Sequence, residues 1–106
     1  MTTDWASDVR KYAPEASSEV VAKIARYCGI ALQSRDASLV ALSDLTEVAR
    51  VKDGFIRRKL GVDLPEAEVD KALASVAETM KGDRTKNRVT VYYLLAERFD
   101  RLSAFH

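Results

Sequence analysis

Residues 89–105 read VTVYYLLAERFDRLSAF, and the conformation of this segment decides the fold. Its first seven residues are β-branched, aromatic or leucine, a composition typical of a buried strand. The continuation is not strand-like, because Phe99, Leu102 and Phe105 keep a helical spacing. A lone strand would also leave its backbone groups unpaired in an otherwise helical chain. We therefore predict a helix over about residues 87–103 that is apolar on most faces and lies at the centre of a small bundle.

The clearest helix pattern lies just upstream, where residues 65–82 read PEAEVDKALASVAETMKG. Pro65 suits a first helical turn, where its missing N–H is not needed, and Gly82 suits the end of a helix. One apolar stripe runs along the segment and comprises Val69, Leu73, Val76 and Met80. This spacing predicts an amphipathic α-helix whose apolar face packs on the core.

Residues 43–61 predict a second long helix. Asp44 is followed three positions later by Glu47, a pair that resembles a capping box at the helix start. Gly61 is a plausible end, and Gly54 inside the segment costs about 1 kcal/mol relative to alanine. We therefore expect one helix over residues 45–60.

The N-terminal half is also predicted to be helical. Residues 17–29 and a short segment that ends at Pro14 show helical spacing of their apolar side chains. For residues 30–43 the pattern fits two alternatives, a short helix and an irregular packed segment. The predicted fold class is all-α, a single small domain over residues 1–106 with four or five helices packed around the apolar C-terminal helix.

Composition places the chain among soluble globular proteins. Of its 106 residues, 47% are apolar and 31% are charged, and the net charge of +1 excludes a strong global attraction to nucleic acid. The single cysteine, Cys28, can form no disulfide within the chain, which fits a reducing cytosol best. No apolar stretch approaches the roughly 18 residues that span a bilayer, and no secretory signal is present. We expect a cytoplasmic protein that does not enter a membrane.

The residue inventory argues against most catalytic chemistry. The only histidine is His106, at the end of the chain, so no triad and no thiol–imidazole pair can be built in the core. Cys28 lies on the apolar stripe of its predicted helix, where a small core residue is expected. One cysteine and one histidine make none of the usual zinc sites, and no phosphate-binding glycine motif is present. We predict no enzyme activity, no cofactor and no catalytic residue.

Acidic side chains offer one weak alternative. Asp63, Glu66 and Asp70 are spaced so that they share a helix face and could bind a hard cation. Their attraction to the positive helix start explains them more simply, so we predict no metal site. The same carboxylates argue against a helix-turn-helix reading, because they would repel DNA phosphates.

Two basic clusters are candidate anion-binding sites. Arg57 and Arg58 lie at a predicted helix end, where cations are favourable. Arg84, Lys86 and Arg88 lie just before a predicted helix start, where cations are unfavourable. Such a local conflict is often found at a functional site, and free N–H groups at the helix start can bind an anion. The candidate anion-binding residues are Arg84, Lys86, Arg88, Arg57 and Arg58.

The two tyrosines that follow the basic loop add little to this hypothesis. Tyr92 and Tyr93 are adjacent and lie a turn or more inside the predicted helix. At least one of them must face the core, whereas stacking on a base requires an exposed ring.

Three runs of sequence resemble a family of short bacterial proteins, domain of unknown function family 2853. These runs are VRKYAP at 9–14, SRDASLVALSD at 34–44 and RVTVYYLLAERF at 88–99. The resemblance covers nearly the whole chain and implies a bacterial, soluble, single-domain protein. It implies no activity and no catalytic residues.

Two functional hypotheses follow. The favoured one is a small non-enzymatic module that binds a protein partner or a second copy of itself. It rests on the apolar residues of the last helix, which exceed what one core face needs. The alternative is an anion or nucleic-acid binding protein that uses the basic loop at residues 84–88.

Overall fold

The computed structural model describes residues 5–29, 39–42, 44–82 and 86–105. Over these residues the chain is all-α, as predicted, and contains no strand. The elements in chain order are α1 (Trp5–Val9), α2 (Ser18–Cys28), α3 (Leu45–Arg50), the π-helix η2 (Val51–Lys59), α4 (Glu66–Thr79), α5 (Arg88–Arg98) and the 3-10 helix η3 (Leu102–Phe105).

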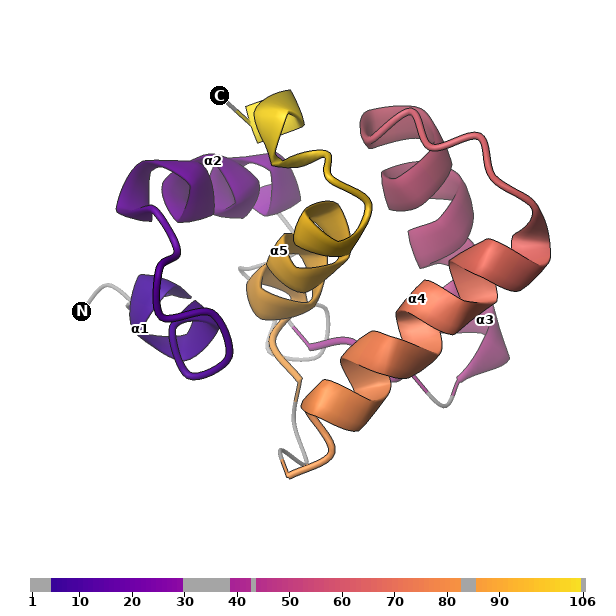
Figure 1. Cartoon of the computed structure of the whole chain (residues 1–106), viewed down its shortest axis with the longest axis horizontal. Coiled ribbons are helices and arrows are strands. Elements are labelled where there is room, and N and C mark those ends of the chain that lie inside the picture. Colours follow the sequence, from indigo (N-terminus) through magenta and orange to yellow (C-terminus); the bar gives the residue numbers. More distant parts are fainter. Residues whose placement is uncertain (1–4, 30–38, 43, 83–85, 106) are drawn as a thin grey trace.

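Helix α5 is the centre of the fold. It lies between α1 and α2 on one side and α3 and α4 on the other, with η3 above it (Figure 1). Eight consecutive residues of α5, from 89 to 96, are buried, and together they contact α1, α2, α4, η2 and η3. This confirms the predicted central helix. The apolar side chains of residues 89–96 had suggested self-association. Because all of them pack inside the molecule, they form no exposed surface for a second copy.

Helix α5 ends earlier than predicted. The helix stops at Arg98, and Asp100 takes a left-handed conformation with φ of 56°. The chain then turns, and its last apolar residues pack as a separate 3-10 turn whose Phe105 is buried. The helical spacing of Phe99, Leu102 and Phe105 therefore belongs to two elements and not to one.

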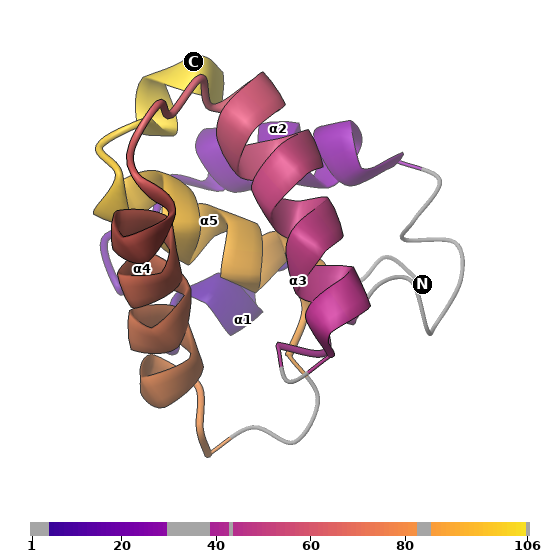
Figure 2. The ribbon, with the colours of Figure 1, turned by 90° about the vertical axis from the view of Figure 1, so that its right-hand side faces the viewer.

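The predicted helix at 45–60 is one continuous coil in the ribbon of Figure 2, and residues 45–59 are helical. Its second half, Val51–Lys59, is a π-helix. Asp44 caps its start as expected, accepting hydrogen bonds from the backbone N–H groups of Thr46 and Glu47. The apolar pattern explains the change. In an α-helix, Val51 and Leu60 would lie on opposite sides, because nine residues make about two and a half turns. The wider π-helical turn, bonded from i to i+5, brings both residues to the core side.

The remaining helices agree with the sequence. Helices α2 and α4 lie within the ranges predicted for them, and α1 is the short helix before Pro14. Of residues 30–43, those at 30–38 and 43 lie outside the described part. Residues 39–42 are not helical: Leu39 forms an isolated antiparallel bridge with Asn87, and Val40 N–H donates to the carbonyl of Lys86 over 2.8 Å. Within the described ranges, no helix has the length and apolar character needed to cross a bilayer.

Candidate functional site

The five residues predicted as an anion site do not all lie in one place. Arg84 lies outside the described residues. Arg57 is half-buried and Arg58 is exposed on η2, where Arg58 lines a hollow together with Asp53 and Arg50. Lys86 is half-buried next to the bridge between Leu39 and Asn87. The structure therefore places Arg57 and Arg58 on a different element from Lys86 and Arg88.

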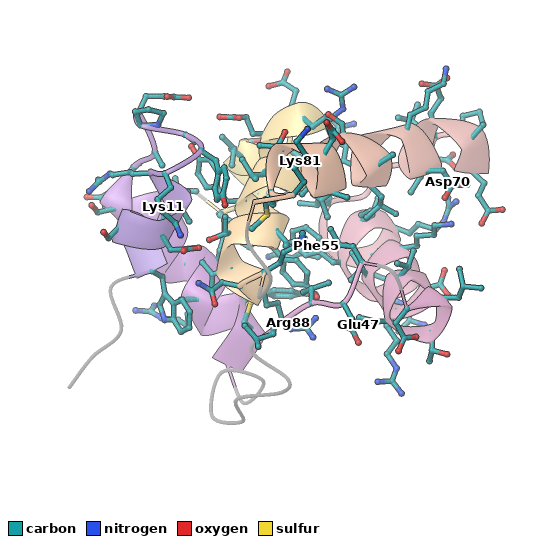
Figure 3. The ribbon with its side chains drawn as sticks, turned by 90° about the horizontal axis from the view of Figure 1, so that it is seen from below. Lys11, Glu47, Phe55, Asp70, Lys81 and Arg88 are labelled. Carbon is teal, nitrogen blue, oxygen red and sulfur yellow. The ribbon has the colours of Figure 1, made fainter. Side chains whose placement is uncertain are left out.

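Arg88 forms a largely buried ion pair inside the fold. Its Nη2 lies 2.6 Å from Oε1 of Glu47, and the two side chains are only 13% and 17% exposed. Nη1 of Arg88 donates to the hydroxyl of Tyr92 over 2.9 Å. Figure 3 shows Glu47 and Arg88 on the side where α3 and α5 face each other. Arg88 thus links α5 to α3, and Glu47, predicted as a capping residue, serves as its counter-ion.

The tyrosine pair belongs to the core. Tyr92 is 7% and Tyr93 is 3% exposed, so neither ring offers a stacking surface. Tyr92 stacks on Phe55, with ring centres 3.8 Å apart. Burial raises the pKa of Tyr92 above its ordinary value, although Arg88 beside it acts in the opposite direction. Both rings therefore hold the helices together.

Cys28 is half-buried at the end of α2. Burial raises the pKa of its thiol from 9.0 to about 11, and nearby Arg88 offsets only part of this effect. A thiol with such a high pKa is almost wholly protonated at neutral pH and is a poor nucleophile. This environment fits the small packing residue that the apolar stripe predicted.

The acidic face of α4 is paired with a lysine from η2. Nζ of Lys52 lies 3.1 Å from Glu66 and 2.5 Å from Asp70, so a cation of the protein itself lies between these carboxylates. No group of three or more possible metal ligands occurs among the described residues.

A different group of basic side chains surrounds a surface hollow. This hollow, hereafter the basic pocket, has a volume of about 350 Å³. Its lining residues come from the end of α2, the end of η2 and from η3, and they are Lys23, Arg26, Tyr27, Lys59, Ala104 and Phe105. Three of the six side chains are cationic, and none is acidic.

The three cations of the basic pocket lack carboxylate partners among the residues that the structure describes. Within the described residues, Lys23, Arg26 and Lys59 form no ion pair. The ends of α2 and η2 explain part of their placement, because cations are favourable near the negative end of a helix dipole. That effect is worth only about 0.3–1 kcal/mol at an exposed site and leaves most of each charge available to a ligand.

Aromatic rings form the floor and wall of the basic pocket. Tyr27 is 43% exposed, and its ring meets that of Phe105 edge-on at 6.1 Å. Nζ of Lys59 lies 5.4 Å from the centre of the Tyr27 ring and 5.0 Å from that of Phe105. The ring of Phe55 packs against that of Tyr27, with the two ring centres 5.9 Å apart. The pocket therefore combines positive charge with an exposed aromatic surface on a rigid base.

Sequence reasoning missed this pocket. One signal was available, because Lys23, Arg26 and Tyr27 are spaced i, i+3, i+4 and so share one helix face. The rest of the pocket lining includes Lys59 and Phe105, which are more than thirty positions away from Tyr27 in the sequence. Only the folded structure brings these two residues next to α2.

The comparisons with known proteins identify a family and no activity. The model of the family described as "Protein of unknown function (DUF2853)" matches residues 4–103. The chain therefore belongs to this family, which confirms the resemblance seen in the sequence. No curated protein matches the chain.

Proposed function

We propose that this domain is a non-enzymatic binding module that holds an anionic ligand in the basic pocket. One observation carries the proposal: Lys23, Arg26 and Lys59 converge on one hollow, and no carboxylate side chain of the described residues lines it. These three cations have no ion-pair partner in the described part of the chain, so they repel one another, and an anion bound among them removes that repulsion. A hollow of about 350 Å³ also falls within the size range of ligand sites.

The basic pocket supports anion binding better than the loop predicted from the sequence. Arg88 already has an anionic partner in Glu47 at 2.6 Å, so a second anion would have to compete with a partly buried carboxylate. Arg58 shares its hollow with Asp53. The basic pocket has no such competitor among its lining residues.

Self-association is not part of the proposal. Its motivation was the apolar surplus of the last helix, and α5 buries residues 89–96 within the molecule. Among the described residues, the large apolar side chains that stay exposed are Tyr27, Leu45 and Leu64, and they come from three different elements or connections.

An NMR titration of the labelled protein with inorganic pyrophosphate at low salt tests the proposal. We expect the amide signals of residues 23–27, 59 and 104–105 to shift in a saturable way. The triple variant Lys23→Gln, Arg26→Gln, Lys59→Gln should lose these shifts. A matched control, Lys71→Gln with Lys81→Gln, removes two cations that are 72% and 74% exposed on α4 and just after it, and should bind as the wild type does.

Two results would contradict the proposal. One is a titration in which the pocket amides do not move while binding is measurable elsewhere on the protein. The other is a triple variant that keeps the wild-type shifts, because binding would then not depend on these three charges.

A further inference from the structure

Building on the proposed anion site, we infer that its ligand is single-stranded nucleic acid. In this arrangement a backbone phosphate lies among Lys23, Arg26 and Lys59, and an unpaired base packs on the ring of Tyr27. The inference rests on the aromatic half of the basic pocket, which anion binding alone does not explain.

The exposure of Tyr27 is the first argument. In the aromatic cluster of Tyr27, Phe55, Tyr92 and Phe105, the last three rings are at most 7% exposed, whereas Tyr27 is 43% exposed. Its hydroxyl lies 3.4 Å from the carbonyl oxygen of Gly54, and its ring rests against three others, so the exposed ring is fixed in position. A fixed, exposed ring beside cations is the arrangement by which proteins stack single-stranded bases.

The position of Lys59 is the second argument. Its ammonium group lies over the rings of Tyr27 and Phe105, at 5.4 Å and 5.0 Å from their centres. A phosphate draws this ammonium toward itself, because a charge-assisted contact is stronger than an exposed cation–π contact. Movement of the Lys59 side chain then uncovers the ring of Tyr27 for a base, so phosphate and base bind together.

The kind of phosphate follows from the elements that form the pocket. Lys23, Arg26 and Tyr27 lie in the C-terminal half of α2, and Lys59 is the last residue of η2. Helix C-termini present carbonyl groups, whereas a terminal phosphate with two charges is usually bound by N–H groups at a helix N-terminus. Long cationic side chains suit a phosphodiester, which carries a single charge and needs no such cradle.

Double-stranded DNA fits the pocket less well. In a duplex the faces of the bases are stacked on each other, so Tyr27 would have no base to contact. The helix that a helix-turn-helix reading would place in the groove is α4, and its first turn carries Glu66 and Glu68. The expected ligand is therefore unpaired.

Fluorescence anisotropy with three labelled ligands of equal length tests the inference at low salt. These are an oligothymidine, an abasic strand with the same backbone, and a duplex. We expect the oligothymidine to bind at least about tenfold more tightly than the abasic strand, the effect of one stacked base. The duplex should bind no better than the abasic strand. The logarithm of the oligothymidine association constant should fall with the logarithm of salt concentration with a slope of about −0.7, the value for one neutralised phosphate.

Variants of Tyr27 separate stacking from charge. Tyr27→Leu should weaken oligothymidine binding about tenfold or more, so that the oligothymidine and the abasic strand bind to this variant with similar affinity. Tyr27→Phe keeps the ring and should bind the oligothymidine as the wild type does. The comparison of oligothymidine with the abasic strand on the wild-type protein needs no variant, so the test holds even where Tyr27→Leu does not fold.

The outcomes distinguish the two proposals. Equal affinity for oligothymidine and abasic strand, or tighter binding of the duplex, would overturn the nucleic-acid inference and leave the anion site intact. A wild-type protein that binds neither pyrophosphate nor any of the three ligands would overturn both. An oligothymidine that binds equally well to the triple variant would place nucleic-acid binding outside the basic pocket and overturn the inference as well.

Discussion

Two regions of this molecule each place a cation beside a tyrosine, but they differ in burial and in the partner of the cation. Inside, Arg88 contacts Tyr92 and forms an ion pair with Glu47, and its side chain is 13% exposed. At the surface, Lys59 lies over the ring of Tyr27, which is 43% exposed, and the described residues that line the basic pocket include no carboxylate. The partner of the cation decides its role: a paired, buried cation holds elements together, whereas an unpaired one is available to a ligand.

The charged side chains of the two regions also differ in how much they contribute to the free energy of unfolding. Removing one partner of a buried ion pair leaves the other charge without compensation, which costs about 3–5 kcal/mol. Exposed charges without partners contribute little, usually within about 0.5 kcal/mol. Removal of charge should therefore destabilise the fold strongly at Arg88 and hardly at all in the basic pocket.

Arg88→Met should have the largest effect. It leaves the Glu47 carboxylate, 17% exposed, without its counter-ion, and it removes a hydrogen bond to Tyr92. We expect a loss of about 3 kcal/mol or more in the free energy of unfolding, measured by urea denaturation. The double variant Arg88→Met with Glu47→Leu should recover part of this loss, because it removes both charges together. A double variant less stable than Arg88→Met alone would mean that Glu47 stabilises the fold in some other way.

Cys28 follows Tyr27 in the chain, and its thiol interacts electrostatically with Arg88. Burial raises the pKa of its thiol from 9.0 to about 11, so the thiolate fraction at pH 8 falls about 100-fold. Reaction with an aromatic disulfide reagent should therefore be slow in the folded protein, and its rate should keep rising up to about pH 11. In urea the same rate should level off near pH 9. A folded-state rate that levels off near pH 9 would show that burial does not control this thiol.

Thr90→Val tests a second buried polar contact and should cost about 1–2 kcal/mol. Thr90 is fully buried, and its hydroxyl donates to Asp8, which also pairs with Lys11 at 3.0 Å. Thermal unfolding at pH 7 measures the loss. Valine keeps the shape of threonine, so the loss reports the hydrogen bond and not a cavity.

The same variant has a defined pH dependence. Burial raises the pKa of Asp8, but hydrogen bonds from Thr90, Lys11 and Asn87 outweigh it and hold the pKa below its ordinary value of 3.8. Asp8 thus contributes stability that is fully present above about pH 4 and is lost as the pH falls through its folded-state pKa. The stability difference between wild type and Thr90→Val should shrink below pH 4. A difference that stays constant down to pH 2 would show that the Asp8 carboxylate is not the partner that matters.

The triple variant of the basic pocket should have the smallest effect on stability. Lys23 and Arg26 are exposed, Lys59 is half-buried, and within the described residues none of the three forms an ion pair. We expect a change within about 0.5 kcal/mol, measured by urea denaturation beside the Lys71→Gln, Lys81→Gln control. A loss above about 2 kcal/mol would mean that these cations hold the fold together as Arg88 does.

Local patterns were enough to predict much of the fold. The stripe of Val69, Leu73, Val76 and Met80 predicted α4, and the continuous apolar run before Phe99 predicted a buried central helix. The π-helix was not predicted, because the expectation of one α-helix ignored that Val51 and Leu60 would then face opposite ways. The spacing of these two residues carried that information.

The candidate site was harder to predict than the helices. Arg88 looked like a cation in an unfavourable place because Glu47, its partner, is 41 positions away in the chain. Lys59 was seen only as part of a helix end, because its neighbours in the pocket come from α2 and η3. Whether a cation is paired is decided by tertiary contacts, and short-range patterns do not contain them.

The most direct test of the central claim is the change in melting temperature that pyrophosphate causes, measured against sodium chloride of equal ionic strength. At about ten times the dissociation constant, binding to the folded state adds about 1.4 kcal/mol, a rise of roughly 6 °C or more for a domain of this size. We predict that Arg88→Met melts far lower than the wild type yet keeps this rise. The triple variant should melt near the wild type and lose the rise. Two results would contradict the claim that the paired Arg88 stabilises the fold and that Lys23, Arg26 and Lys59 bind the ligand. One is a triple variant that keeps the rise in melting temperature, and the other is an Arg88→Met protein that folds and loses this rise.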